Sequence, residues 1–191
     1  MKSSIEKASV VGLGYVGLPT AAVLASRGVE VIGVEINPSV VERINAGDVH
    51  ITEPDLDILV QGTVATGRLR ATTTPEPASV FVIAVPTPFQ DDHEPDLSHV
   101  KSAAEAITPV LERGNLVILE STSPVGTTAK LTEWLAAARP DLSFPGKSQK
   151  APDISIAYCP ERVLPGRVLI ELVDNDRIIG GVSPDCAERA V

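Results

Sequence analysis

Three glycines near the start of the chain have the spacing of a turn that binds dinucleotide phosphates. Gly12, Gly14 and Gly17 follow an apolar run over 8–11 and precede a helix-compatible run over 18–27. In such a G-x-G-x-x-G set the first glycine permits a tight turn, the second lets backbone approach a pyrophosphate, and the third lets the helix pack closely on the sheet. The helix N-terminus then directs free N–H groups at the phosphates. Because short glycine patterns also arise by chance, the residues that follow decide the interpretation.

An acidic residue at the end of the second predicted strand indicates which dinucleotide is bound. The apolar run over 29–36 contains Glu35, eighteen residues after Gly17. A carboxylate at this distance accepts hydrogen bonds from the adenosine ribose hydroxyls. It would repel a 2′-phosphate, and no Arg or Lys at 36–39 compensates, so the sequence predicts NAD rather than NADP. The alternative, a solvated carboxylate at a strand end, fits the spacing less well.

Composition limits the classes of protein to consider. The chain has 191 residues, 43% of them hydrophobic and 21% charged, which predicts a globular domain. Its formal charge of −9, the absence of a Lys/Arg cluster and 3% aromatic residues argue against nucleic-acid and membrane partners. The N-terminus shows no signal-peptide pattern, so a cytoplasmic location is expected. His50, His93 and His99 lack ligand spacing, so no metal site is predicted.

Strand-like and helix-like segments alternate along the chain. This alternation predicts an α/β, doubly wound Rossmann fold with a mainly parallel sheet and helices on both faces. The predicted strands are 7–12, 29–35, 69–72, 79–85, 115–121, 154–158 and 176–181, and the predicted helices are 15–27, 38–46, 53–61, 97–112 and 127–138. Turn-rich segments fall at 86–96 and 139–153. Residues 1–182 are expected to form the domain, with 183–191 starting a truncated helix that leads to absent domains.

The loops after the strands are where such a fold would place chemistry, because ligands bind beyond the carboxyl ends of parallel strands. Prolines and hydroxyl residues gather at 86–88, 122–128 and 159–166. Any one of these loops could be ordinary turn chemistry, with Thr127 or Thr128 capping a helix. Three of them converging beside the glycine turn indicate a functional site.

Four motifs in order resemble the UDP-glucose/GDP-mannose 6-dehydrogenase family across essentially the whole chain. They occupy 12–19, 85–88, 120–127 and 158–166, and shared details lie at 86–89, 92–96 and 175–181. The resemblance implies oxidation of a primary alcohol at sugar C6 to a carboxylate in two steps, using two NAD. A cysteine thiolate captures the intermediate aldehyde, and the resulting thioester is hydrolysed.

The resemblance also implies roles for individual residues. Tyr15 and Val16 would line the pyrophosphate turn, Thr122 and Glu161 would support catalysis near the reacting centre, and Arg162 and Val163 would contact the nucleotide sugar. The implied cofactor-binding set is Gly12, Leu13, Gly14, Tyr15, Val16, Gly17, Glu35, Thr87 and Thr128.

Two positions depart from the pattern of the family. The UDP-glucose enzymes have a second glutamate four residues after the first, where this chain has Pro165. That difference favours the branch acting on UDP-N-acetyl-D-mannosamine and leaves the hydrolytic base unassigned. At position 35 this branch often has Asp, and the longer Glu changes the geometry more than the specificity.

The family nucleophile belongs to a Gly-Gly-His-Cys segment that these residues do not contain. Cys159 and Cys186 are interpreted as structural thiols, because no cation or histidine is expected beside them to lower a thiol pKa. The chain is therefore expected to bind NAD without completing turnover. A UDP-sugar substrate and a homodimer are expected for the full-length protein.

Two alternatives stay open. One is a UDP-glucose or GDP-mannose 6-dehydrogenase domain, and the other is a non-catalytic NAD-binding module. A stop codon after residue 191 would favour the module, whereas continuation into a long helix and a Gly-Gly-His-Cys segment would favour the enzyme.

Overall fold

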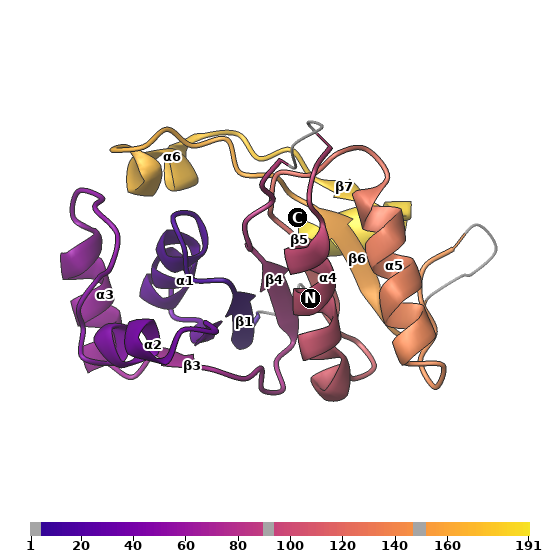
Figure 1. Ribbon diagram of the computed structural model, residues 1–191, viewed down its shortest axis with the longest axis horizontal. Coiled ribbons are helices and arrows are strands. Elements are labelled where there is room, and N and C mark those ends of the chain that lie inside the picture. The colour runs from indigo at the N-terminus through magenta and orange to yellow at the C-terminus, as the bar shows by residue number, and fades with distance from the viewer. Residues whose placement is uncertain (1–4, 90–93, 147–151) are drawn as a thin grey trace.

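The computed structural model describes residues 5–89, 94–146 and 152–191. Within these residues one seven-stranded sheet has the order β3-β2-β1-β4-β5-β6-β7 (Figure 1). The strands are β1 (Lys7–Val11), β2 (Glu30–Val34), β3 (Leu69–Thr72), β4 (Val80–Ile83), β5 (Leu116–Leu119), β6 (Ser155–Tyr158) and β7 (Gly180–Gly181). The helices are α1 (Gly17–Ser26), α2 (Pro38–Asn45), α3 (Leu56–Ala65), α4 (Ser98–Ile107), α5 (Thr127–Ala138), α6 (Val168–Asp174) and α7 (Pro184–Ala190), with a 3₁₀ turn at Thr108–Val110 after α4.

The strand order reverses between β1 and β4. Neighbouring strands from β3 to β6 are parallel, and only the edge pair β6–β7 is antiparallel among the described residues. Val10 of β1, for example, lies opposite Gly33 of β2 and Val82 of β4. This arrangement confirms the predicted Rossmann fold, and it opens a crevice at the carboxyl ends of β1 and β4.

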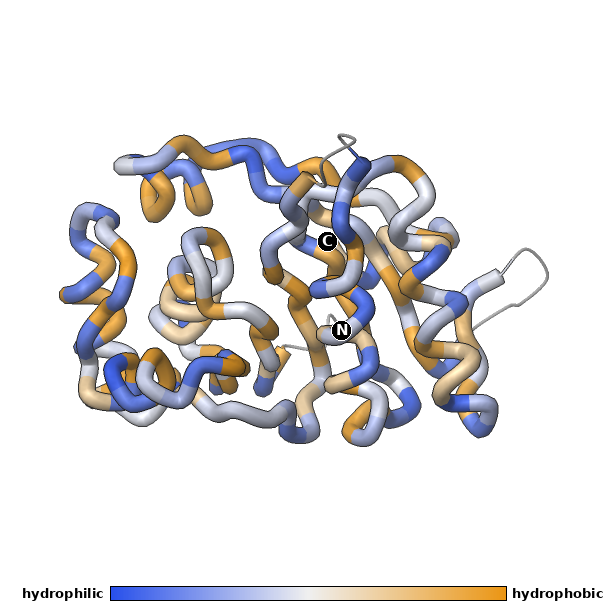
Figure 2. Tube along the Cα trace, viewed as in Figure 1, coloured by the Kyte–Doolittle hydropathy of each residue, from blue (hydrophilic) through white to orange (hydrophobic). Residues whose placement is uncertain are grey.

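The sheet separates two hydrophobic cores because successive strand residues point to opposite faces. Phe81 and Ile83 pack with the buried residues of α4 and α5, whereas Val80 and Val82 pack with those of α1, α2 and α3. Figure 2 shows apolar segments along the central strands and hydrophilic segments at many of the outer turns. Burial on both faces explains the nearly continuous apolar strands in the sequence.

Elements with local start signals lie where the sequence predicted them. Asn37 accepts a hydrogen bond from the backbone of Ser39 at 3.1 Å, and Pro38 occupies the first turn of α2. Helix α5 has the predicted bounds, and the helix expected near Ser183 is α7, with Cys186 buried. Helix α1 begins two residues later than predicted, at Gly17, because the glycine turn occupies the preceding residues.

In less regular segments two predicted elements have other bounds in the structure, and one helix was missed. The helix predicted over 53–61 is α3, which starts only after Asp55, a residue in the left-handed region with φ of 61°. Helix α6 was not predicted. The strand predicted over 176–181 is reduced to the two residues of β7, which pair with β6 at the edge of the sheet.

Parts of the predicted turn-rich segments, including His93 and the start of the 92–96 detail, lie outside the described residues. No helix in the described part of the chain is long and apolar enough to cross a membrane.

Candidate cofactor site

The three glycines of the turn have different surroundings. Gly12 has φ of +90°, and a Cβ there would lie 2.9 Å from the carbonyl oxygen of Ala84. A Cβ at Gly17 would lie 1.8 Å from the carbonyl oxygen of Gly12, whereas a Cβ at Gly14 would meet no atom within 4 Å. The backbone conformation and close packing therefore require the first and third glycines, while the second leaves open space against the backbone.

The start of α1 is available to an anion. Val16, at the N-cap position, makes no capping hydrogen bond with its side chain, and the first turn contains no acidic residue. The first N–H groups of a helix have no partner within the helix, and they carry the positive end of its dipole. A pyrophosphate beside Gly14 would supply acceptors for these groups.

Glu35 lies at the carboxyl end of β2, next to the turn. Its Oε2 accepts a hydrogen bond from the backbone of Leu13 at 3.3 Å, and its Oε1 accepts one from the backbone of Asn37 at 3.1 Å. These bonds hold the carboxylate where the adenosine ribose of a bound dinucleotide is expected. His50, to which the sequence assigned no role, lies beside it: burial lowers the pKa of His50, and the charge of Glu35 opposes that change.

A pocket of about 360 Å³ lies at the crevice. It is lined by residues of the glycine turn and of the loops after β4, β5 and β6: Gly14, Tyr15, Val16, Ala84, Val85, Pro86, Thr87, Glu120, Ser121, Thr122, Glu161 and Val163. The predicted convergence of these loops is therefore confirmed. Hydrogen bonds join two of them, since Thr87 Oγ1 donates to the carbonyl of Thr122 at 2.6 Å and Ser121 Oγ donates to that of Val85 at 2.7 Å.

Several residues predicted for the site do not line this pocket. Leu13 is buried and packs toward Gly33. Thr128 is half-buried in the first turn of α5, and the guanidinium of Arg162 donates to the carbonyl of Asp176 at 2.9 Å. The described residues thus bring Thr87, Thr122, Glu161 and Val163 together but leave Thr128 and Arg162 at the periphery.

Two buried carboxylates share one guanidinium beside the pocket. Glu120 is only 2% exposed and accepts from Arg177 Nη2 at 3.0 Å, while Arg177 Nη1 forms an ion pair with the buried carboxylate of Glu161. Burial raises the pKa of Glu120, although Arg177 and the hydroxyl of Thr20 oppose the change. A single cation facing two buried acids leaves an excess of negative charge, so a proton on Glu120 is favoured.

Arg177 also corrects the prediction for Cys159. Cys159 and Glu120 both raise the pKa of Arg177 against the opposing effect of burial, so a cation does lie near this buried thiol and the expectation of none was wrong. Arg177 follows Cys159 by eighteen residues, and only the return of the chain to the edge of the sheet brings the two together. Cys186 is a buried residue of α7, and its Sγ lies 3.3 Å from Ser183 Oγ.

A further buried acid, Glu53, was not predicted from the sequence. Its carboxylate accepts hydrogen bonds from the hydroxyl of Tyr15 at 2.8 Å and from the backbone of Gly166 and Val168 at 2.9 and 2.7 Å. Burial would raise the pKa of Glu53, but these three bonds, with that from Tyr15 first, hold it below its ordinary value. The same bond to Glu53 raises the pKa of Tyr15. No local pattern marks Glu53, because its partners lie far away in the sequence.

Doubly wound domains bind dinucleotides in a crevice of this kind, and the open space at Gly14, the uncapped helix and Glu35 fit NAD. The fold and the site therefore define the class as a dinucleotide-binding domain. A model of the UDP-glucose/GDP-mannose dehydrogenase family, NAD binding domain, matches residues 6–191. The chain belongs to this family, of which it is the NAD-binding domain.

Named relatives agree with this assignment. The chain is 65% identical over 182 residues to an NDP-N-acetyl-D-galactosaminuronic acid dehydrogenase of Ralstonia nicotianae, covering 95% of the chain and 43% of the relative. It is 61% identical over 187 residues to a UDP-N-acetyl-D-mannosamine dehydrogenase of Yersinia pestis, covering 98% of the chain and 44% of the relative. The structure of a UDP-D-ManNAc dehydrogenase from Pyrococcus horikoshii superposes with a TM-score of 0.89 at 41% identity, covering 96% and 43%. The chain thus spans less than half the length of these relatives.

Proposed function

We propose that the protein containing this chain is an NAD-dependent nucleotide-sugar 6-dehydrogenase that oxidises UDP-N-acetyl-D-mannosamine to the uronate with two NAD. The observation behind the proposal is a single pocket in which the open turn at Gly14 faces the loop with the buried carboxylate of Glu161. The Yersinia relative and Pro165 both support the mannosamine branch. The Ralstonia relative supports a second candidate, an NDP-N-acetyl-D-galactosamine substrate.

In this proposal some residues of the chain bind the cofactor and another handles a proton. The turn at Gly14 and the N-terminus of α1 bind the pyrophosphate, and Glu35 binds the adenosine ribose. Thr87 contacts the cofactor from the loop after β4, and Thr128 does so from the first turn of α5. Bound NAD supplies the hydride acceptor. Glu161, buried in the wall of the same pocket, is placed to hold or move a proton beside the reacting carbon.

The remaining roles lie with the sugar side. Thr122 lines the pocket near Glu161, and Val163 and Arg162 follow in the loop proposed to contact the nucleotide sugar. The nucleophile belongs to the part of the full-length protein beyond these residues. The domain division at 182, the homodimer and the cytoplasmic location stay predictions.

Cofactor preference tests the proposed site in the chain itself. Calorimetric titration is expected to show NAD binding more tightly than NADP. The variant Glu35→Ala should weaken NAD binding about ten- to a hundredfold, because a hydrogen bond to a charged group contributes about 1.5–3 kcal/mol. It should also narrow the difference between the cofactors, whereas Glu42→Ala, which changes an exposed glutamate on α2, should alter neither. Tighter binding of NADP than of NAD, or unchanged affinities for both cofactors in Glu35→Ala, would contradict the proposed role of Glu35.

The substrate is tested in the full-length protein by following NADH formation. Four substrates are compared: UDP-N-acetyl-D-mannosamine, UDP-N-acetyl-D-galactosamine, UDP-glucose and GDP-mannose. The first should give the highest kcat/KM. A higher value for the galactosamine epimer would select the second candidate, and no NADH with any of them would favour a non-catalytic module.

A further inference from the structure

Glu53 connects segments that are far apart in the sequence. Glu53 belongs to the segment that connects α2 to α3, and it is only 7% exposed. One oxygen, Oε2, accepts from the hydroxyl of Tyr15 and from the backbone of Gly166, while Oε1 accepts from the backbone of Val168. Gly166 and Val168 are 113 and 115 residues away. The carboxylate therefore joins the glycine turn to the start of α6.

Helix α6 depends on this external acceptor. Arg167, at its N-cap position, makes no side-chain capping bond, so Glu53 supplies the acceptor that the helix itself lacks. A negative charge at a helix N-terminus is also favourable. Figure 2 shows α6, labelled in Figure 1, as a predominantly apolar segment, yet Ile170 and Val173 are 57% and 51% exposed. Only Val168 of this helix is fully buried, so packing alone holds α6 weakly.

The loop before α6 is connected to the helix by two side-chain contacts. Glu171 accepts from the backbone of Leu164 at 2.9 Å and pairs with Arg167 at 3.2 Å. The same loop carries Glu161 and Val163, which line the pocket across from Tyr15. Glu53 therefore contacts both Tyr15, on one wall of the pocket, and the loop that supplies Glu161 and Val163 to the same pocket.

We propose that Glu53 is a positioning residue that couples NAD binding at the glycine turn to the placement of the loop over 161–168, the pocket wall on the nucleotide-sugar side. The coupling rests on the cofactor site proposed above. When NAD holds the backbone at 14–16, Tyr15 holds Glu53, and Glu53 holds Gly166 and Val168. By linkage, ordering of the loop strengthens NAD binding by the same factor.

The variant Glu53→Gln tests the proposal with little change in shape. An amide has one acceptor oxygen, and its NH₂ group would face a donor in this site, so at least one of the three bonds is lost. We expect the Kd for NAD to rise about fivefold or more, within the usual range of coupling between sites. Hydrogen exchange should show NAD increasing the protection of the Gly166 and Val168 amides in the original chain but not in the variant.

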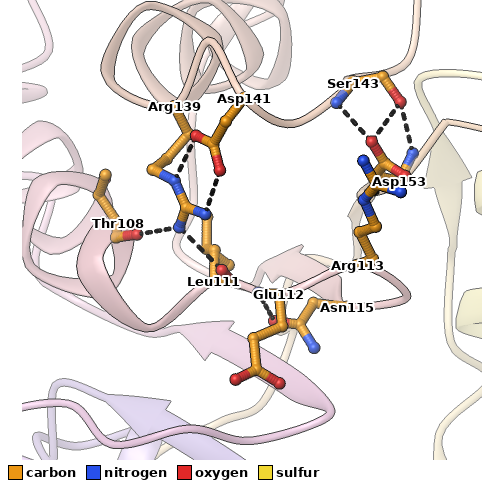
Figure 3. Close-up of polar contacts among 9 residues, drawn as sticks. All are labelled: Thr108, Leu111, Glu112, Arg113, Asn115, Arg139, Asp141, Ser143 and Asp153. Atoms are coloured by element: carbon orange, nitrogen blue, oxygen red, sulfur yellow. Dashed lines mark hydrogen bonds and ion pairs between the residues drawn. The ribbon is translucent and has the colours of Figure 1, made fainter.

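Asp153→Asn is the matched control. Asp153 is likewise a carboxylate that accepts two hydrogen bonds, from the backbone and hydroxyl of Ser143, both at 2.8 Å (Figure 3). It precedes β6, at the amino end of that strand, whereas the pocket lies at the carboxyl ends of the strands. This variant should lower the melting temperature while leaving both the NAD affinity and the NAD-dependent protection unchanged, which separates coupling from general loss of stability.

Tyr15→Phe separates anchoring from coupling and remains informative if Glu53→Gln does not fold. It should leave the Gly166 and Val168 amides protected without NAD but remove the further protection that NAD gives. Unchanged NAD affinity and unchanged NAD-dependent protection in both variants would overturn the proposal. If the original chain binds no NAD, the proposed cofactor site is contradicted instead. In that case, equal hydrogen exchange of the Gly166 and Val168 amides in the original chain and in Glu53→Gln would overturn the anchoring role of Glu53.

Discussion

Gly14 and Gly17 are three residues apart in the same turn, yet the structure makes opposite demands on them. The position of a Cβ at Gly17 is already occupied by the carbonyl of Gly12, so this glycine belongs to the packing of α1 on β1. The space beside Gly14 is open and forms part of the pocket. Two residues of one motif thus serve two purposes, one of stability and one of binding.

Alanine at each position should separate these purposes. Gly17→Ala should destabilise the chain by about 3 kcal/mol or more, because the backbone must move to admit a methyl group. Gly14→Ala should change the free energy of unfolding by less than about 0.5 kcal/mol but lower NAD affinity by at least about tenfold, the equivalent of 1.4 kcal/mol. Urea denaturation and calorimetric NAD titration measure the two effects. Equal stability of Gly17→Ala, or undiminished NAD binding by Gly14→Ala, would refute this division.

The site residues differ in how far the sequence revealed them. Glu35 could be placed because its spacing from the glycines and its position at a strand end are both local features. Thr87, Thr122 and Glu161 follow strands, and parallel strands bring such positions to one edge. Glu53 and Arg177 could not be found this way, because their roles come from partners contributed by other elements.

At the scale of the elements, Arg139 joins the ends of two helices on the face covered by α4 and α5. It follows α5 and donates to the carbonyls of Thr108 and Leu111 at 2.9 and 2.8 Å, where the 3₁₀ turn after α4 ends (Figure 3). Asp141 holds the guanidinium with two hydrogen bonds of 2.8 and 2.7 Å. A cation at helix carbonyl ends is also favoured by the helix dipole.

Removing this connection should affect stability and not the cofactor site. Arg139→Ala should cost about 1–3 kcal/mol in urea denaturation, because it removes the guanidinium donor from both carbonyls. Asp141→Asn should cost less, because the ion pair is exposed and Arg139 keeps its bonds to both carbonyls. NAD affinity should stay the same in both. A larger loss in Asp141→Asn than in Arg139→Ala would contradict the importance of the carbonyl contacts.

Helices whose start is signalled by neighbouring residues were predicted accurately, whereas a helix capped by a distant residue was not. Helix α2 was predicted to within one residue at its end, because Asn37 and Pro38 signal its start locally. Helix α6 was missed because its cap comes from Glu53, on a different part of the chain. Strand β7 pairs with β6 at only two positions, Gly180 and Gly181, and the apolar pattern over 176–181 does not reveal where this pairing stops.

At the scale of the whole molecule, stability should depend on pH through the buried acids at the carboxyl edge of the sheet. The pKa of Glu120 is raised in the folded protein by burial, so the folded state retains a proton that the unfolded state releases. As pH rises above the ordinary glutamate pKa of about 4.3, the contribution of this group to stability falls until its raised folded pKa is passed.

Glu120→Gln should remove this contribution, because the amide does not ionise. The stability of the variant relative to the original chain should therefore increase as pH rises through the same interval, measured by urea denaturation at a series of pH values. Glu133→Gln, which changes an exposed glutamate on α5, should follow the original chain throughout. If the free energy of unfolding depends on pH in the same way in Glu120→Gln and in the original chain, the pKa of Glu120 is not raised by folding.

The sequence alone determined the class of fold and the type of cofactor. Alternating apolar segments, helix caps and the spacing from Gly12 to Glu35 are local features, and local features are readable without knowing what packs against them. The family resemblance extended this to a nucleotide-sugar dehydrogenase, and the match over 6–191 bears out the family.

Only the tertiary structure decided which of these residues meet. It separated Gly14 from Gly17 in purpose, placed Thr128 and Arg162 outside the pocket, and set Arg177 against Glu120, Glu161 and Cys159. It also joined Glu53 to a loop more than a hundred residues away. Such contacts depend on how several elements pack at once, so no spacing within the chain encodes them.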